Sequence, residues 1–172
     1  KVKNYCYYLK PKTINLSLAD IGTGSGCIAI TIKKEIPQLR VYSIDNSKKA
    51  IRVAKKNAKI HKTHIYFFDG DLVSPLKNRH IDVLVANLPY LNPKQKNPYK
   101  KILSYEPKSS LYSKDNGTYL YKKLFRELSF YNIFPSFIVC EIGKHQSQIL
   151  LKYIEKYLPH TTQYSLIIGS DR

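Results

Sequence analysis

The first candidate site is a glycine-rich turn with a carboxylate in front of it. Asp20 is followed by glycines at every second position, namely Gly22, Gly24 and Gly26. Glycine lets a backbone turn tightly and approach a ligand without a clashing side chain. A dinucleotide-binding turn would carry its third glycine at position 27, which is Cys27 here. This difference favours a ligand that has no pyrophosphate to bind, such as an S-adenosyl group.

Two carboxylates end the next two strand-like runs. Asp45 lies 23 residues after Gly22, and Asp71 closes the third apolar run. A carboxylate at the end of the second strand can accept hydrogen bonds from both ribose hydroxyls, and Asp71 is placed to bind an adenine amino group. Taken singly, a glycine turn is often only a turn, and a strand-end aspartate is often only a helix cap. Because the carboxyl ends of parallel strands share one edge, the set predicts a cofactor site there.

A third set of residues, Asn87-Leu88-Pro89-Tyr90, follows an apolar run and predicts an acceptor site. A nitrogen conjugated to a carbonyl or an aromatic ring is planar and a poor nucleophile. Two hydrogen-bond acceptors on its two N–H groups can hold it in line with a methyl group. The side-chain oxygen of Asn87 and the backbone carbonyl of Leu88 can be these acceptors, and Tyr90 can stack on the flat group. Taken alone, the same run also fits a proline turn with a packed tyrosine.

The elements that must position these residues are short apolar runs alternating with longer amphipathic ones. This pattern predicts a doubly wound α/β domain with a mostly parallel sheet. The segment 87–117 is irregular and proline-rich, and a loop of that length in a compact domain is usually functional. Strands are expected at residues 15–20, 39–45, 64–68, 81–86, 137–142 and 164–168. Helices are expected at residues 27–35, in the segment capped by Ser47, in the segment that contains Leu120, Leu124 and Leu128, and at residues 146–157.

The composition fits one domain, because 172 residues with 43% hydrophobic content can form a single core. Apolar runs fall short of the about 18 residues that a membrane span needs, and no secretory signal precedes the first strand. The three cysteines, Cys6, Cys27 and Cys140, lie in apolar surroundings and predict buried thiols in a reducing compartment. We expect a cytoplasmic protein, or an organellar one in a eukaryote. No metal is expected, because His61 and His64 lack partners at a recognisable ligand spacing.

The formal net charge of +17 has two interpretations. A basic face would attract polyanions such as RNA through counterion release and electrostatic steering. Alternatively, lysines are simply frequent on most polar faces of a chain rich in Lys, Asn, Ile and Tyr, and we favour this explanation for the total. One stretch beside the acceptor motif is dense enough to suggest a partner: Lys94, Lys96, Lys100, Lys101 and Lys108.

At these motifs the sequence resembles the bacterial and organellar methyltransferases that modify the glutamine of the Gly-Gly-Gln motif in peptide chain release factors. The resemblance runs from about residue 15 to residue 172 and includes the glycine turn, the two strand-end aspartates and the acceptor motif. The tract after the acceptor motif distinguishes this family from other methyltransferases. It consists of Tyr105-Glu106-Pro107, Leu111, Asp115-Asn116-Gly117 and Glu141-Ile142-Gly143.

The resemblance implies that residues 1–172 are a methyltransferase catalytic domain with a Rossmann-like, S-adenosylmethionine-dependent fold. The reaction would be methyl transfer to a glutamine side-chain nitrogen of a release factor, by a monomer. Asn87, Pro89 and Tyr90 would be catalytic, and these residues together with Leu88 would bind the glutamine. The cofactor contacts would be Asp20, Gly22, Thr23, Gly24, Ser25, Gly26, Asp45, Asp71, Leu72 and Asn87.

The sequence departs from the family pattern in three places. The usual second residue of the acceptor motif is proline, and it is Leu88 here. The family's amino-terminal helical domain and a Pro-rich segment before Lys1 are missing, and so is the last strand beyond Arg172. We therefore expect a fragment. In this fold the missing strand lies between the fifth and sixth strands, so the strand at 164–168 should lie at a gap or an edge of the sheet.

Two alternative functions stay open. The first is adenine methylation in RNA or DNA, because ribosomal RNA adenine methyltransferases often carry Asn-Leu-Pro-Tyr and would suit the positive charge. Those enzymes usually begin the glycine turn with glutamate rather than Asp20, and they lack the Tyr-Glu-Pro tract. The second is a non-catalytic RNA-binding protein on a degenerate methyltransferase fold. The presence of every expected contact residue speaks against it.

Overall fold

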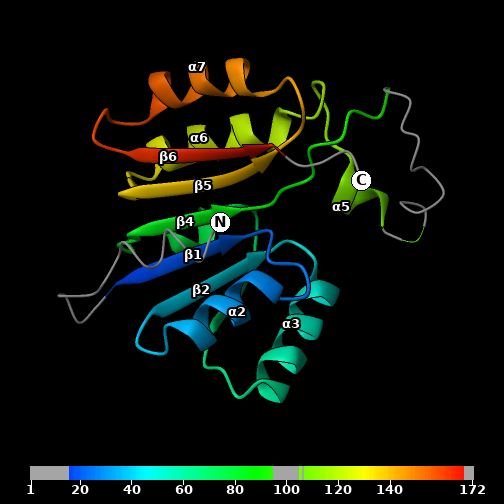
Figure 1. Cartoon of the computed structure of the whole chain (residues 1–172), viewed down its shortest axis with the longest axis vertical. Coiled ribbons are helices and arrows are strands. Elements are labelled where there is room, and N and C mark those ends of the chain that lie inside the picture. Colours follow the sequence, from blue (N-terminus) through cyan, green and yellow to red (C-terminus); the bar gives the residue numbers. More distant parts are fainter. Residues whose placement is uncertain (1–15, 95–104, 106, 169–172) are drawn as a thin grey trace.

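The structure is a computed structural model that describes residues 16–94, 105 and 107–168. Its strands form one sheet in the order β3-β2-β1-β4-β5-β6, and every neighbouring pair is parallel (Figure 1). The first strand, β1, lies in the middle of the sheet, the next two strands extend the sheet outward to β3, and β4 to β6 form the other half. This is the predicted doubly wound arrangement. The strands are β1 (Ser17–Ile21), β2 (Arg40–Asp45), β3 (Tyr66–Asp69), β4 (Val83–Ala86), β5 (Phe137–Ile142) and β6 (Gln163–Ile168).

Helices cover both faces of the sheet, with α2 beside β2, α3 beside β2 and β3, and α6 and α7 beside β5 and β6 (Figure 1). They are α2 (Cys27–Glu35), α3 (Lys48–Ile60), α5 (Lys108–Leu111), α6 (Tyr119–Phe130) and α7 (Ser147–Tyr157), with a short 3₁₀ helix η1 at Ser74–Leu76. Successive strand residues point to opposite faces. Ile44 and Leu84 accordingly join Leu124 in one core cluster, whereas Val41 packs with Ala29 in the other.

The local sequence explains why α3 begins and packs where it does. The Ser47 hydroxyl accepts a hydrogen bond from the Ala50 N–H at 3.2 Å, as expected of an N-cap serine. Ala54 and Ala58 are buried, and the lysines of the helix are exposed. Small side chains on one face therefore bring α3 close to the glycine turn, because Cβ of Ala54 would lie 3.1 Å from a Cβ added at Gly26.

Most predicted boundaries agree with the structure to within two residues. Two short helices, η1 and α5, were not predicted. Both are single turns of three or four residues, which is too short to produce a hydrophobic period. The prediction for β6 is confirmed in part, because β6 lies at the edge of the sheet. No gap separates it from β5, however, since the two strands pair over six residues.

The thiols differ from the prediction in one respect. Cys140 in β5 is buried, but Cys27 is exposed, because it is the first residue of α2 and follows directly on the glycine turn. Cys6 lies outside the described residues. None of the described helices is long and apolar enough to cross a membrane. Among residues 16–94 and 107–168, no three His, Cys, Asp or Glu side chains gather as potential metal ligands.

Candidate functional site

The glycine turn follows β1 and lies directly against the acceptor motif. Gly22, Gly24 and Gly26 all have positive φ, at 72°, 57° and 84°, in the left-handed region that glycine enters without strain. The Gly22 N–H donates to the Ile44 carbonyl at 2.9 Å, which ties the turn to β2. A Cβ at Gly22 would lie only 2.8 Å from Cδ2 of Leu88. The predicted cofactor turn and the predicted acceptor motif are therefore packed together.

Asp20 lies beneath this turn with only 1% of its surface exposed. Its carboxylate accepts a hydrogen bond from the Thr23 hydroxyl at 2.6 Å. Burial raises the pKa of Asp20 to about 6, the Thr23 and Ala29 hydrogen bonds oppose this rise, and the charge of Asp45 adds to it. The side chain thus holds the turn in shape through Thr23. A contact of its own with a ligand stays a prediction.

Asp45 ends β2 and links the turn to α3. One carboxylate oxygen accepts the Gly24 N–H at 2.9 Å, and the other accepts the Ser47 N–H at 2.8 Å. A carboxylate has about four lone-pair directions, so each oxygen keeps capacity for a further donor such as a ribose hydroxyl. On the outer side of the turn, the Ser25 carbonyl accepts a hydrogen bond from the Asn57 side chain at 2.9 Å.

Asp71 follows β3 and forms an ion pair with Lys123 of α6. Lys123 also lies 3.6 Å from Glu127 one helical turn later. Leu72, the next predicted cofactor contact, is 5% exposed and has a φ of 42°. A left-handed backbone is unfavourable for leucine and is found preferentially at functional sites. Lys123 was not among the predicted site residues, because no local pattern relates it to Asp71.

The acceptor motif begins with an exposed residue and continues with a buried one. Asn87 directly follows β4 and is exposed, whereas Leu88 is buried and Pro89 is half-buried. The Leu88 N–H donates to the Tyr121 hydroxyl at 3.0 Å. That hydroxyl is also within hydrogen-bonding distance of the carbonyls of Ala86, at 3.2 Å, and Glu141. Tyr121 therefore joins the start of the motif to the ends of β4 and β5.

Tyr90 is half-buried and is held at both ends. Its hydroxyl donates to the Glu141 carboxylate at 2.9 Å, and its backbone carbonyl accepts a hydrogen bond from the Gln146 side chain at 2.8 Å. Glu141, Gln146 and Tyr121 were not predicted as site residues. The Glu-Ile-Gly run at the end of β5 was the available signal for Glu141, because it belongs to the tract that distinguishes the resembled family.

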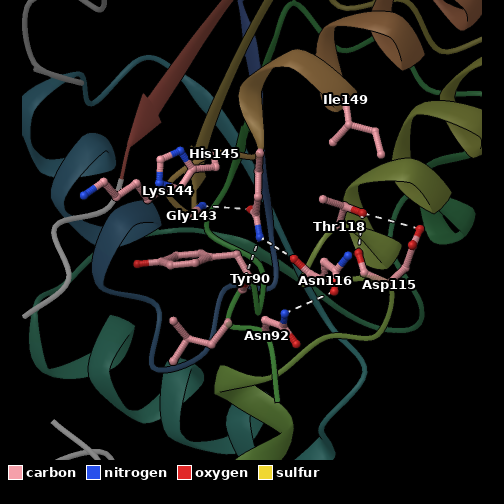
Figure 2. A pocket seen from close by; sticks show the side chains of 11 residues that line it. Tyr90, Asn92, Asp115, Asn116, Thr118, Gly143, Lys144, His145 and Ile149 are labelled. Atoms are coloured by element: carbon pink, nitrogen blue, oxygen red, sulfur yellow. Dashed lines mark hydrogen bonds between the residues drawn. The ribbon is translucent and has the colours of Figure 1, made fainter. Parts of the chain in front are cut away.

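A cavity of about 360 Å³ opens beside Tyr90 (Figure 2). It lies between the loop after β4, the start of α6 and the segment that leads into α7. Its lining has polar and apolar surface in about equal parts and includes Asn92, Asn116, His145 and Ile149. The predicted cofactor residues are not part of this lining. Tyr90 thus belongs both to the acceptor motif and to the lining of this cavity.

The structure describes two residues of the lysine-rich stretch. Lys94 and Lys108 are exposed, whereas Lys96, Lys100 and Lys101 lie outside the described residues. In the Tyr-Glu-Pro tract, Tyr105 is exposed, and Glu106 also lies outside the described residues. The predicted role of these lysines in partner binding stays a prediction.

Comparisons with known proteins identify the family of this chain and its fold. The family model "Methyltransferase small domain" matches residues 8–107. Release factor glutamine methyltransferases of Flavobacterium psychrophilum and Enterococcus faecalis are 36% and 34% identical over 162 and 158 residues, or 92% and 91% of this chain. The chain spans 57% of the length of each. The solved ribosomal protein L11 methylase of Lactobacillus delbrueckii subsp. bulgaricus shares the fold, with a TM-score of 0.60, 18% identity and coverage of 91% of this chain and 64% of that one.

Proposed function

The chain belongs to the methyltransferase small domain family, and on this premise we propose that it methylates the side-chain amide nitrogen of a glutamine in a peptide chain release factor. The observation that carries the proposal is the contact between the glycine turn and the acceptor motif, where Leu88 leaves no room for a side chain at Gly22. Methyl transfer needs the methyl donor and the acceptor nitrogen next to each other. The glycine turn is the predicted binding site of the donor, and the acceptor motif is the predicted binding site of the nitrogen.

S-adenosylmethionine is the cofactor in this proposal, and when bound it supplies an electrophilic methyl group. The described residues fit it. The backbone of the glycine turn, with Thr23 and Ser25, forms the cradle, and Asp45 keeps acceptor capacity for the ribose hydroxyls. Asp71 and Leu72 would bind on the adenine side. The carboxylates of Asp20 and Asp45 also complement the positive charge of the cofactor.

The acceptor residues would act by positioning and polarising the glutamine amide. The exposed Asn87 side chain and the Leu88 carbonyl would each accept one N–H of the amide, which orients its nitrogen for transfer. Pro89 favours an extended Leu88, and Tyr90, held by Glu141 at 2.9 Å, would stack on the amide plane. No covalent intermediate on the protein and no metal is part of this mechanism.

The release factor as the substrate is supported by the relatives. Proteins named release factor glutamine methyltransferase are 29–36% identical to this chain over most of its length. The Asp-Asn-Gly turn and the Glu-Ile-Gly run that accompany the resemblance both contact the acceptor motif, through Gly117 and Glu141. We also propose that the protein acts as a monomer and in the cytoplasm.

One other enzymatic function has specific support. Adenine methylation in RNA would use the same acceptor motif and would be favoured by the net charge of +17. Radiolabelled methyl transfer by the full-length protein to purified release factor and ribosomal RNA, side by side, separates the two functions. We expect label in the release factor. Label in the RNA alone would overturn the proposed substrate, and cofactor binding without transfer to either would favour a non-catalytic protein.

A further inference from the structure

Gln146 makes three hydrogen bonds that join three separate segments of the site. Its side-chain nitrogen donates to the carbonyls of Tyr90, at 2.8 Å, and Asn116, at 2.9 Å (Figure 2). Its side-chain oxygen accepts the Gly143 N–H at 2.8 Å. Both N–H groups of the amide and its oxygen are thus engaged, in a side chain that is only 7% exposed. The residue connects the acceptor loop, the turn before α6 and the end of β5.

Gly117 shows how tightly this junction is packed. A Cβ at Gly117 would lie 2.0 Å from the Tyr90 carbonyl oxygen and 2.4 Å from the Gln146 side-chain nitrogen, and its φ is 85°. A residue with any side chain would therefore push these hydrogen-bonded atoms apart. The Asp-Asn-Gly turn has its glycine at this position because the Tyr90 carbonyl and the Gln146 amide occupy the space.

A role in starting α7 does not account for Gln146. The residue occupies the N-cap position of α7, yet its side chain makes no capping hydrogen bond to that helix. Instead it reaches back across the site to Tyr90, which is 56 residues away in the sequence. An N-cap serine or aspartate would serve the helix better. The side chain at this position serves the acceptor loop.

We propose that Gln146 is a positioning residue for methyl transfer, because it fixes the Tyr90 carbonyl and with it the orientation of the acceptor motif against the glycine turn. The inference rests on the proposed methyltransferase function. The motif is held at Leu88 by Tyr121 and at Tyr90 by Glu141 and Gln146. Asn87 is exposed and follows β4 directly, so loss of the anchor at Tyr90 would let the acceptor residues shift.

The chemistry of the site requires an amide at position 146. Two backbone carbonyls face the side-chain nitrogen, and a buried carbonyl that loses its donor is costly. A glutamate there would place a carboxylate against the same two carbonyl oxygens. A leucine of similar size would fill the space and supply no donor, so the loop could relax toward other partners or water. A displacement of about 1 Å can reduce a methyl-transfer rate by about a hundredfold.

The test uses the full-length protein with Gln146→Leu, and with Gln148→Leu as the matched control, since Gln148 is an exposed residue of α7. Three quantities are measured: kcat, KM for the release factor, and the cofactor Kd by calorimetry. We expect kcat of Gln146→Leu to fall at least about tenfold. The cofactor Kd should stay within about twofold, because the hydrogen bonds of Gln146 reach no predicted residue of the cofactor turn. The control should match the wild type.

A kcat of Gln146→Leu within twofold of the wild type would overturn the proposal. A cofactor affinity that falls by the same factor as kcat would also overturn it, because the substitution would then have destabilised the whole domain. If Gln146→Leu does not fold, Gln146→Asn is measured against the same two criteria, because it keeps both N–H donors one methylene short of the carbonyls. If the wild type methylates ribosomal RNA instead of the release factor, the proposed substrate fails. The kcat comparison is then made on that acceptor.

Discussion

Replacing Leu88 with proline tests which contacts hold the acceptor motif in place, because proline keeps the backbone carbonyl that is proposed to bind the amide. Leu88 is 4% exposed, and its N–H donates to the Tyr121 hydroxyl at 3.0 Å. Proline has no N–H, so a hydrogen bond of about 1 kcal/mol is lost. Proline also has one side-chain carbon fewer than leucine, which is worth about 0.8 kcal/mol when buried, while the stiffer unfolded chain offsets about 0.4–1 kcal/mol. We expect the free energy of unfolding to fall by about 1 kcal/mol.

Urea unfolding of the full-length protein measures this loss, and a double-mutant cycle with Tyr121→Phe assigns it. Leu88→Pro should cost about 1 kcal/mol less when the Tyr121 hydroxyl is already absent. Methyl transfer by the folded Leu88→Pro protein should stay within about tenfold of the wild type, because Pro89 already favours the extended conformation and the carbonyl remains. Equal costs in the two backgrounds, or a Leu88→Pro protein as stable as the wild type, would refute the role given to this hydrogen bond.

Three further predictions address the two binding elements. Asn87→Ala removes an acceptor that orients the amide nitrogen, so single-turnover methylation should slow by about a hundredfold or more, while cofactor binding measured by calorimetry should change much less. Near-normal turnover would mean that the loop is only a structural turn. Tyr90→Phe removes the hydrogen bond to Glu141 and should lower kcat about tenfold at unchanged cofactor Kd, and an unchanged kcat would mean that this hydrogen bond does not orient the ring. Burial raises the pKa of Asp20 from 3.8 to about 6, so the stability this group contributes is fully present below the unfolded value and is lost as the pH rises through 6. Urea unfolding should therefore show the stability of the wild type, relative to Asp20→Asn, falling by up to about 3 kcal/mol between pH values of about 4 and 7, and a constant difference would contradict the burial of this carboxylate.

The parts of the fold that the sequence predicts well are those fixed by local patterns. Apolar runs followed by a glycine or an aspartate identified the ends of β1, β2 and β3, because these residues must lie at the carboxyl edge of a parallel sheet. The cap at Ser47 was predictable for the same reason, since its partner is the Ala50 N–H three residues later. Register and strand order then bring Gly24 to Asp45, which accepts its N–H at 2.9 Å.

What the sequence did not reveal are contacts between residues far apart in the chain. Lys123 meets Asp71 across 52 residues, and Gln146 meets Tyr90 across 56. Neither side chain belongs to a local motif, so only the packing of α6 and α7 against the sheet brings them to the site. Cys27 was expected to be buried because its neighbours are apolar, but it begins α2 on the solvent side.

The central claim is that the packed glycine turn and acceptor motif transfer a methyl group to a glutamine of a release factor. The most direct measurement is single-turnover transfer from labelled S-adenosylmethionine by the full-length protein, to the release factor and to a version whose Gly-Gly-Gln glutamine is replaced by alanine. The account predicts label on the intact release factor, at that glutamine, and none on the replaced version. Equal labelling of the two, or no labelling of either by a protein that binds the cofactor, would contradict it.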